Sequence, residues 1–153
     1  MKTNIITQKS EIEEVINQCE ACYMSMVDQN GMPYNLPFNF AYEENVLYFH
    51  SAPVGKKMDI LKANPTVCIV FSNAHQLHHH DVDVACSYSM KFKSIIVYGK
   101  VEFIDDIAEK TIWMNKIMQK YTQRDFSYSL PAITNVACFK VVIEKLSGKK
   151  RGY

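Results

Sequence analysis

The residues best suited to chemistry fall in one short segment, Tyr48–Lys57, which reads YFHSAPVGKK. The pattern places a strand end, a loop of small residues and a helix start in series, with Lys56 and Lys57 in the first helical turn. Helix amino ends carry unpaired amides and a partial positive charge, so each lysine there is unfavourable by about 0.3–1 kcal/mol. A phosphate bound at that end would reverse this effect. The alternative is that both lysines are solvated charges on a weak helix.

Histidines form two further candidate sites. His50 ends the strand before that helix, beside two aromatic residues, where an imidazole can stack on a heteroaromatic ligand or relay a proton. A hydrogen-bonded histidine at a strand end is the alternative. The segment His75–Asp81 contains four histidines, and imidazole binds zinc, copper and nickel. Because adjacent histidines in a loop rarely converge on one ion without distant partners, a metal site is the weaker interpretation and no metal is assigned.

Motifs typical of several other enzyme classes are absent from the sequence. The chain has no GxSxG nucleophile elbow, no Walker loop and no GxGxxG, which argues against an α/β-hydrolase, a P-loop NTPase and a Rossmann dinucleotide site. The five cysteines are odd in number and lie mostly in apolar runs, which favours reduced thiols. Cys19 and Cys22 have C-x-x-C spacing, but no second pair completes a zinc site, so plain packing is the preferred interpretation.

Length and composition are typical of one globular domain covering 1–153. Of the 153 residues, 48% are hydrophobic and 22% charged, and 17 basic residues against 16 acidic ones leave a net charge of +1. That balance disfavours nucleic acid as the main partner. No run of 18 apolar residues and no signal peptide is present, so the sequence predicts a cytoplasmic protein without a membrane partner.

Hydrophobic periodicity predicts about six strands and three helices. Ser10 and Glu13 have capping-box spacing and open the first helix. The strands are expected at 22–27, 33–42, 46–51, 66–71, 94–104 and 136–143. The first three should form an antiparallel meander, and a polar loop should cover 72–89.

The other two helices are expected from about Gly55 to Asn64 and from Asp106 onward. The second of these should bury Ile107, Met114, Met118 and Tyr121, while the basic segment 147–151 should be a frayed tail. The sum is an α+β fold whose antiparallel sheet can close into a small barrel.

Alternation is strictest over residues 33–42, where Tyr34, Leu36, Phe38 and further aromatic residues share one face. Pro37 interrupts that strand, and since proline cannot donate to a ladder it belongs at an edge or a bulge. Backbone groups freed there could face a ligand, or Pro37 could mark a simple edge strand.

Taken in order, these segments resemble the pyridoxamine 5'-phosphate oxidase-like family of FMN-binding split barrels, and within it the nitroimidazole-resistance (Nim) branch. The resemblance covers roughly residues 12–150. It is carried by GMPYNLPFNF at 31–40, LYFHSA at 47–52, GKK at 55–57 with Leu61 and Asn64-Pro65, KSIIVYGKVE at 93–102 and SGK at 147–149.

The resemblance implies an antiparallel six-stranded split barrel and a homodimer with FMN at the subunit interface. The strand from Leu36 to Phe40 would lie along the isoalloxazine, with backbone groups of Pro37 and Asn39 bonded to it, and Lys56 and Lys57 would replace an Arg-Lys pair that holds the phosphate. The cofactor-binding residues so implied are Leu36, Pro37, Phe38, Asn39, His50, Ser51, Lys56, Lys57 and Ser94.

The function implied by the resemblance is FMN-dependent reduction of a small acceptor such as a nitroaromatic, with electrons from NAD(P)H or another donor. His50 would be the catalytic residue, since a histidine at this position is implicated beside the flavin in the Nim branch. The oxidases' substrate-binding arginine and histidine have no counterpart here, which argues against pyridoxamine phosphate as the substrate. The alternatives are a flavin- or haem-binding module without turnover and, last, a metal-dependent protein using His75–His80.

Overall fold

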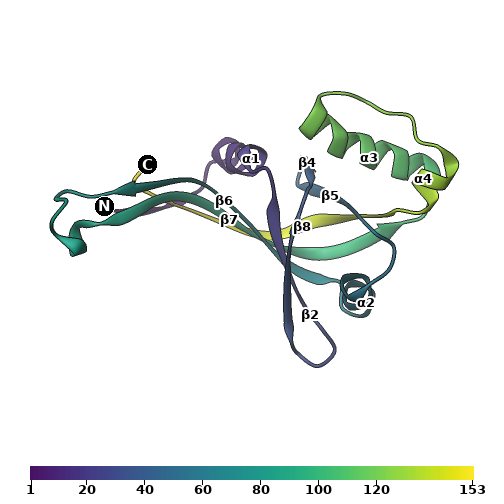
Figure 1. The fold of residues 1–153 in the computed structure, drawn as a ribbon, viewed down its shortest axis with the longest axis horizontal. Coiled ribbons are helices and arrows are strands. Elements are labelled where there is room, and N and C mark those ends of the chain that lie inside the picture. The colour runs from purple at the N-terminus through teal and green to yellow at the C-terminus, as the bar shows by residue number, and fades with distance from the viewer.

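All strands of this protein pair antiparallel in a single curved sheet. The computed structural model describes residues 1–153 (Figure 1). In chain order the elements are β1 (Thr3–Ile6), α1 (Lys9–Gln18), β2 (Cys22–Val27), β3 (Pro33–Phe38), β4 (Ala41–Glu43), β5 (Val46–Ser51), α2 (Lys56–Ala63), β6 (Thr66–His78), the 3-10 turn η1 (Ala85–Ser87), β7 (Ser89–Ile104), α3 (Ile107–Thr122), α4 (Leu130–Thr134) and β8 (Ala137–Arg151). The predicted α+β class is confirmed, with eight strands rather than six and four α-helices rather than three.

The strand order differs from the predicted meander. Along the sheet the order is β3-β2-β6-β7-β8-β5-β4, and β1 pairs with β8. The expected strand over 33–42 breaks after Phe38, because the Phe40 amide donates to the Tyr121 hydroxyl of α3 (3.1 Å) instead of to a neighbouring strand. The break lets β3 stay with β2 while β4 and β5 join β8 at the other end of the sheet.

The core fills the inside of the curved sheet. The alternation predicted for 33–42 is confirmed by burial, since Phe38 and Phe40 are buried and Leu36 packs against the core. Phe49 of β5 and Phe139 of β8 stack with their ring centroids 5.3 Å apart, and the Phe38 ring meets Phe49 edge-on at 5.7 Å. Aromatic pairs of this kind add to the stabilisation from burial alone. The two ends of the sheet are therefore closed by ring packing near the end of β3.

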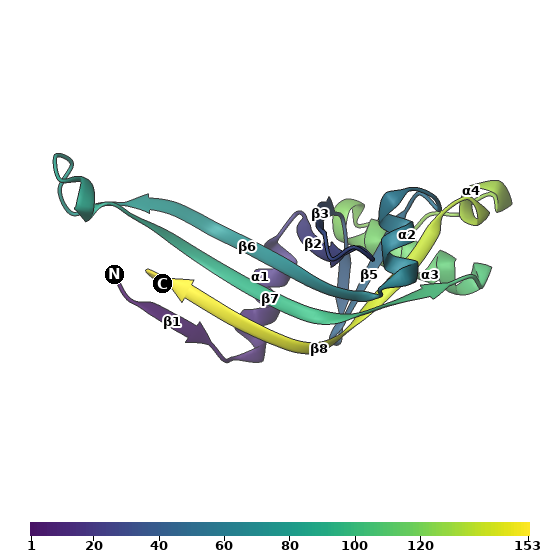
Figure 2. The same ribbon diagram turned by 90° about the horizontal axis from the view of Figure 1, so that it is seen from below.

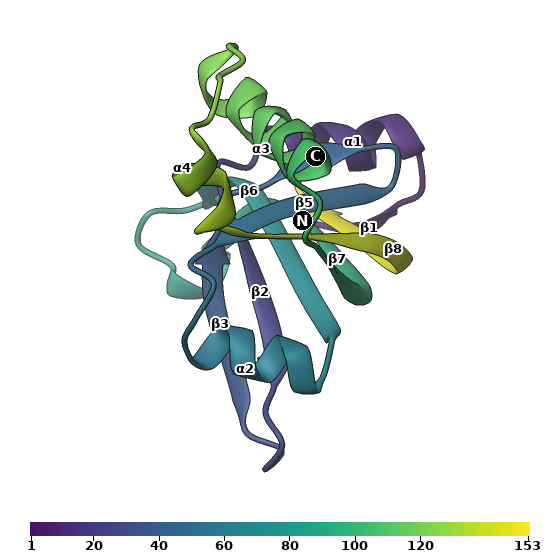
Figure 3. The ribbon, with the colours of Figure 1, turned by 90° about the vertical axis from the view of Figure 1, so that its right-hand side faces the viewer.

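Three helices cover different parts of the sheet (Figure 3). Helix α1 contacts β6 and β7, α2 contacts β2, and α3 lies over β4, β5 and β8. The predicted apolar stripe of α3 is wrong: Lys110, Trp113 and Ile117 are the buried residues, while Ile107 and Tyr121 are exposed. The Trp113 ring packs on Tyr48 of β5 at 5.4 Å, which fixes the face that the helix presents to the sheet.

The two helix starts predicted from capping patterns have different outcomes. Asp106 caps α3 as expected, because its carboxylate accepts from the Glu109 amide at 2.9 Å. Helix α1, however, begins at Lys9 with Gln8 as its N-cap, and no side chain caps it. Ser10 therefore lies inside the first turn, so the predicted capping box is wrong.

Strands β6, β7 and β8 extend into an arm away from α2, α3 and α4 (Figure 2). Much of the predicted loop over 72–89 is strand, since β6 continues to His78 and β7 begins at Ser89. The predicted frayed tail is also wrong, because Gly148 to Arg151 pair with both β1 and β7. None of the helices is both long enough and apolar enough to cross a membrane.

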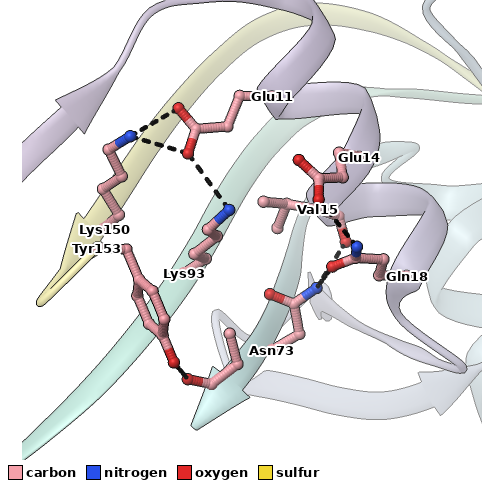
Figure 4. A network of polar contacts seen from close by, with 9 residues as sticks. Glu11, Glu14, Val15, Gln18, Asn73, Lys93, Lys150 and Tyr153 are labelled. Atoms are coloured by element: carbon pink, nitrogen blue, oxygen red, sulfur yellow. Dashed lines mark hydrogen bonds and ion pairs between the residues drawn. The ribbon is translucent and has the colours of Figure 1, made fainter.

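A charged cluster fastens α1 to this arm (Figure 4). Lys150 donates to both carboxylate oxygens of Glu11 at 2.9 Å, and the Lys93 ammonium lies 3.4 Å from the same carboxylate. These contacts, led by the Lys150 hydrogen bond, lower the pKa of Glu11. The N-terminal helix and the C-terminal strand are thus held together by one shared carboxylate.

Candidate functional site

The end of β5 leads through a short loop into α2, as the sequence predicts. Gly55 is the N-cap, with φ 111° and ψ 169°, a backbone conformation adopted almost only by glycine. The amides of Met58 and Asp59 both donate to the Gly55 carbonyl oxygen, at 2.8 and 3.2 Å. The amides of Lys56 and Lys57 precede that turn, so they have no acceptor within the helix and remain available to an anion.

The two lysines at this helix start turn toward β3. The Lys56 ammonium lies 4.8 Å from the centre of the Tyr34 ring, and the Lys57 ammonium lies 5.6 Å from the centre of the Phe38 ring. Neither lysine forms an ion pair. The fold therefore brings the predicted phosphate-binding pair to the strand predicted to hold a flavin ring, and neither ammonium is ion-paired with a carboxylate.

Two neighbouring residues at the end of β5 have buried polar atoms without a partner. These are the Ser51 hydroxyl oxygen and Nδ1 of His50. Buried polar atoms are nearly always hydrogen-bonded, so these two atoms remain available to bond a ligand. Because successive side chains of a strand point to opposite faces, Ser51 lies with Phe49 in the barrel interior and His50 lies with Tyr48 on the face that α3 covers.

His50 is held in its neutral form. Burial lowers its pKa, and the nearby positive charge of Lys57 lowers it further. Its cross-strand neighbour is Cys138, whose own pKa burial raises to about 11. At pH 7 His50 is therefore an imidazole that can donate one N–H, next to a protonated thiol.

Strand β3 is an edge strand, which settles the position of Pro37. It pairs only with β2, so a proline there removes no hydrogen bond from the middle of the sheet. Pro37 and Asn39 are exposed, whereas the Leu36 and Phe38 side chains turn inward. Backbone groups along the outer edge of β3 are thus open to a ligand, and the side chains of the same strand are divided between its two faces.

Ser94 lies on β7, three strands away from β3 in the sheet. Cross-strand pairing places Pro37, Tyr23, Val70 and Ile96 in one row across β3, β2, β6 and β7. Ser94 is two residues from Ile96 on the same sheet face, three strand spacings or roughly 14 Å from β3. The structure therefore places Ser94 on the sheet face that carries Pro37, three strands away from β3.

The remaining motifs do not join this site. His75 and His78 belong to β6 in the projecting arm, and no group of three or more His, Cys, Asp or Glu residues is arranged to hold a metal ion. Cys19 and Cys22 are both buried, and burial raises the pKa of Cys22 to about 12. These two thiols pack in the core and are poorly suited to act as thiolates.

Two features of the site were missed in the sequence. Tyr34 receives the Lys56 ammonium on its ring; its place two residues before Leu36 in the alternating strand was the available signal. Asn39 borders a cleft of about 420 Å³ whose other wall includes Lys120 and Tyr121 of α3. No local sequence pattern links residues so far apart, so only the folded chain reveals that cleft.

Comparison with known proteins adds to this geometry. The pyridoxamine 5'-phosphate oxidase family profile matches residues 8–150. A crystal structure from Bacteroides thetaiotaomicron, assigned as a candidate 5-nitroimidazole antibiotic resistance protein, is 45% identical with TM-score 0.87, and the match covers 97% of this chain and 87% of that one.

More distant solved structures share the fold. A flavocytochrome from Azotobacter vinelandii is 19% identical with TM-score 0.82, over 97% of this chain and 70% of that one. An FAD-binding protein from Mesorhizobium loti is 23% identical with TM-score 0.70, over 99% and 100%. No curated protein sequence matches. The match over 8–150 and the 45% identity confirm the predicted resemblance, including that to the nitroimidazole-resistance branch: the chain belongs to the pyridoxamine 5'-phosphate oxidase family.

Proposed function

We propose that this protein is a cytoplasmic homodimer that binds FMN and passes electrons from NAD(P)H or another donor to a small acceptor such as a nitroaromatic compound. The observation that carries the proposal is the pair Lys56 and Lys57, which lies at an open helix start and faces β3. Two ammonium groups without carboxylate partners, next to free helix amides, are suited to a phosphate dianion.

Two kinds of similarity support the proposal that this protein binds a flavin. The 45% identical chain is a candidate nitroimidazole resistance protein, and resistance of that kind is compatible with reduction of a nitro group. The same fold occurs in a protein described as FAD-binding and in one from Mycobacterium smegmatis described as binding FAD and heme. The fold can therefore accommodate a flavin, and the lysine pair is what this chain offers to hold one by its phosphate.

The chain's own residues would divide the work as follows. Lys56, Lys57 and the first amides of α2 bind the phosphate, and the open edge of β3 around Pro37 and Asn39 orients the ring. A bound flavin supplies the electron-transfer chemistry. His50, kept neutral by burial and by Lys57, holds one ring proton at the end of β5, and the orphaned Ser51 hydroxyl offers a hydrogen bond from the barrel side.

The test compares two single variants of untagged protein. Lys57→Ala should raise the dissociation constant for FMN about tenfold or more, because a charge-assisted hydrogen bond to phosphate is lost. His79→Ala, in the distant arm, should leave FMN binding unchanged. Equal FMN retention by the two variants would remove the phosphate assignment.

The same preparations separate turnover from passive binding. Absorption spectra identify any bound chromophore, and NADH or NADPH consumption with a nitroaromatic acceptor measures turnover. A flavin spectrum without consumption would favour a flavin carrier, and a Soret band would favour haem, so either result would overturn the oxidoreductase proposal.

A further inference from the structure

A further lysine, Lys120, lies beside the residues that directly follow β3. The cleft of about 420 Å³ introduced above is walled by the end of α1, by Asn39 directly after β3, and by Lys120 and Tyr121 of α3. The Tyr121 hydroxyl donates to the Glu20 carbonyl oxygen at 2.7 Å and accepts from the Phe40 amide at 3.1 Å. One side chain thus ties all three walls together, which gives the cleft a fixed shape.

Lys120 is half-buried in this cleft and has no acidic partner. Its ammonium donates to the Asn17 carbonyl oxygen at 2.9 Å and lies 4.2 Å from the centre of the Phe40 ring, but it forms no ion pair. Burial lowers its pKa, as expected for an ammonium with too little compensating charge. An ammonium has three N–H groups, so two remain for a ligand.

The other polar groups around Lys120 define what could bind. The Asn39 side chain is exposed and makes no hydrogen bond within the chain, so its amide can also donate to a ligand. Glu20 lines the cleft as well and is its one acidic side chain, yet its carboxylate does not pair with Lys120. An ammonium and an amide donor that line one cleft fit a small molecule that carries a carboxylate.

A neighbouring cleft shows the contrast. The cleft of about 450 Å³ between β4 and α3 is also lined by a lysine, Lys116, but that lysine pairs with Glu43. Its Gln119 donates to Asp125, and Asn115 bonds the backbone of Phe126. The lysine there is paired with a carboxylate, whereas Lys120 has no ion pair and the Asn39 side chain has no hydrogen bond.

We propose that the cleft at Lys120 is the co-substrate site of this protein and that it binds small organic anions through Lys120 and Asn39. The assignment rests on the proposed function, because Asn39 immediately follows the strand assigned to the flavin ring. A molecule held by Lys120 would therefore lie beside the edge of that ring.

The test is calorimetric titration with 4-nitrobenzoate, and with methyl 4-nitrobenzoate as an uncharged compound of nearly the same shape. The wild-type protein should bind the anion more tightly than the ester. Lys120→Met should weaken binding of the anion about tenfold or more and leave the ester unaffected. Lys116→Met, one helical turn away on the same helix, should change neither.

Two more variants test charge rather than structure. Lys120→Arg keeps the positive charge and should restore most of the affinity for the anion, which a merely structural role of the lysine stem would not predict. Glu20→Gln removes the single negative charge of the cleft and should lower the dissociation constant for the anion about two- to threefold. No anion binding by the wild type, or equal losses in Lys120→Met and Lys116→Met, would overturn the proposal.

FMN content is measured in each preparation to keep this proposal separate from the first. Protein that retains FMN but shows no Lys120-dependent anion binding overturns the co-substrate site and leaves the proposed function standing. Protein that binds the anion through Lys120 but cannot hold FMN overturns the proposed function, and with it the co-substrate role of the cleft.

Discussion

At the scale of single residues, the informative side chains are lysines whose charge is left uncompensated. Lys56 and Lys57 are unusual in a first helical turn, and the structure shows their ammonium groups over the Tyr34 and Phe38 rings. Lys120 shares the property but has no sequence signal, since lysine near the end of a helix is ordinary. The lysine pair at the start of α2 was predicted from the sequence, whereas Lys120 was recognised only in the folded structure. The ammonium groups of both proposed sites form no ion pair.

Replacing Lys56 with arginine should strengthen FMN binding. A guanidinium group can bond a phosphate through two parallel N–H groups, which an ammonium cannot do. We expect Lys56→Arg to lower the dissociation constant about threefold or more, measured by quenching of flavin fluorescence. Lys62→Arg, in the last turn of the same helix, is the control and should have no effect. Weaker binding by Lys56→Arg would place the phosphate elsewhere.

At the scale of elements, helix starts and strand ends decide where the site residues lie. Gly55 turns the chain from β5 into α2, and the break after Phe38 sends β3 and β4 to opposite ends of the sheet. Each of these local features sets the direction of the chain that follows it, and so the position of the site residues on that chain.

Gly55→Ala should destabilise the protein by about 1–3 kcal/mol through backbone strain alone. A side chain at this position would meet nothing within 4 Å, so the cost comes from its φ of 111° and not from a clash. Urea unfolding measures the loss, and FMN affinity should fall with it because the helix start shifts. Val54→Ala, at an exposed neighbouring position, serves as the control; comparable losses in both variants would contradict the strain argument.

Asp106→Ala and Ser10→Ala should differ in stability although both alter a predicted cap. Asp106 accepts the Glu109 amide, and loss of such a cap costs about 1 kcal/mol. Ser10 caps nothing, so its replacement inside the first turn of α1 should cost little. Chemical denaturation of the two variants, side by side, checks the difference, and an equal cost would show that Ser10 does cap α1 in solution.

At the scale of the whole molecule, the N-terminal and C-terminal segments of the chain pair with each other. Strand β1 pairs with the end of β8, and the Glu11 carboxylate is shared by Lys93 and Lys150 (Figure 4). The arm that contains β6, β7 and β8 is thereby tied to α1, which packs on β6 and β7. The ion cluster of Glu11, Lys93 and Lys150 thus holds the N-terminal helix and the C-terminal strand together.

The contribution of Glu11 to stability should depend on pH. Its pKa is lowered in the folded protein, chiefly by the Lys150 hydrogen bond, so its stabilising effect is present above its ordinary pKa and is lost as the pH falls through the folded value. We expect Glu11→Gln to lower the unfolding free energy by about 1 kcal/mol at pH 7 and by less at pH 3. Urea titrations at both pH values, with Glu14→Gln as the control, provide the measurement. A loss of the same size at both pH values would rule out a charge effect.

Local patterns in the sequence predicted the elements near the candidate site well. The bounds of β2, β5 and α2, the inward faces of Leu36 and Phe38, and the lysine pair all follow from periodicity and turn chemistry over a few residues. Besides the meander, the capping box at Ser10 and the loop over 72–89, the errors include α3, whose buried face was misassigned, and the C-terminal segment, which was expected to fray. Both depend on packing against distant strands, which periodicity within one segment does not specify.

The sequence by itself determined the fold class, the family resemblance and the two lysines at the start of α2, because each depends on residue types at fixed local spacing. Only the tertiary structure decided the strand order and the cleft at Lys120. The Phe40 amide meets the hydroxyl of Tyr121, 81 positions away, and contacts between such distant residues form only when the whole sheet and its helices pack together.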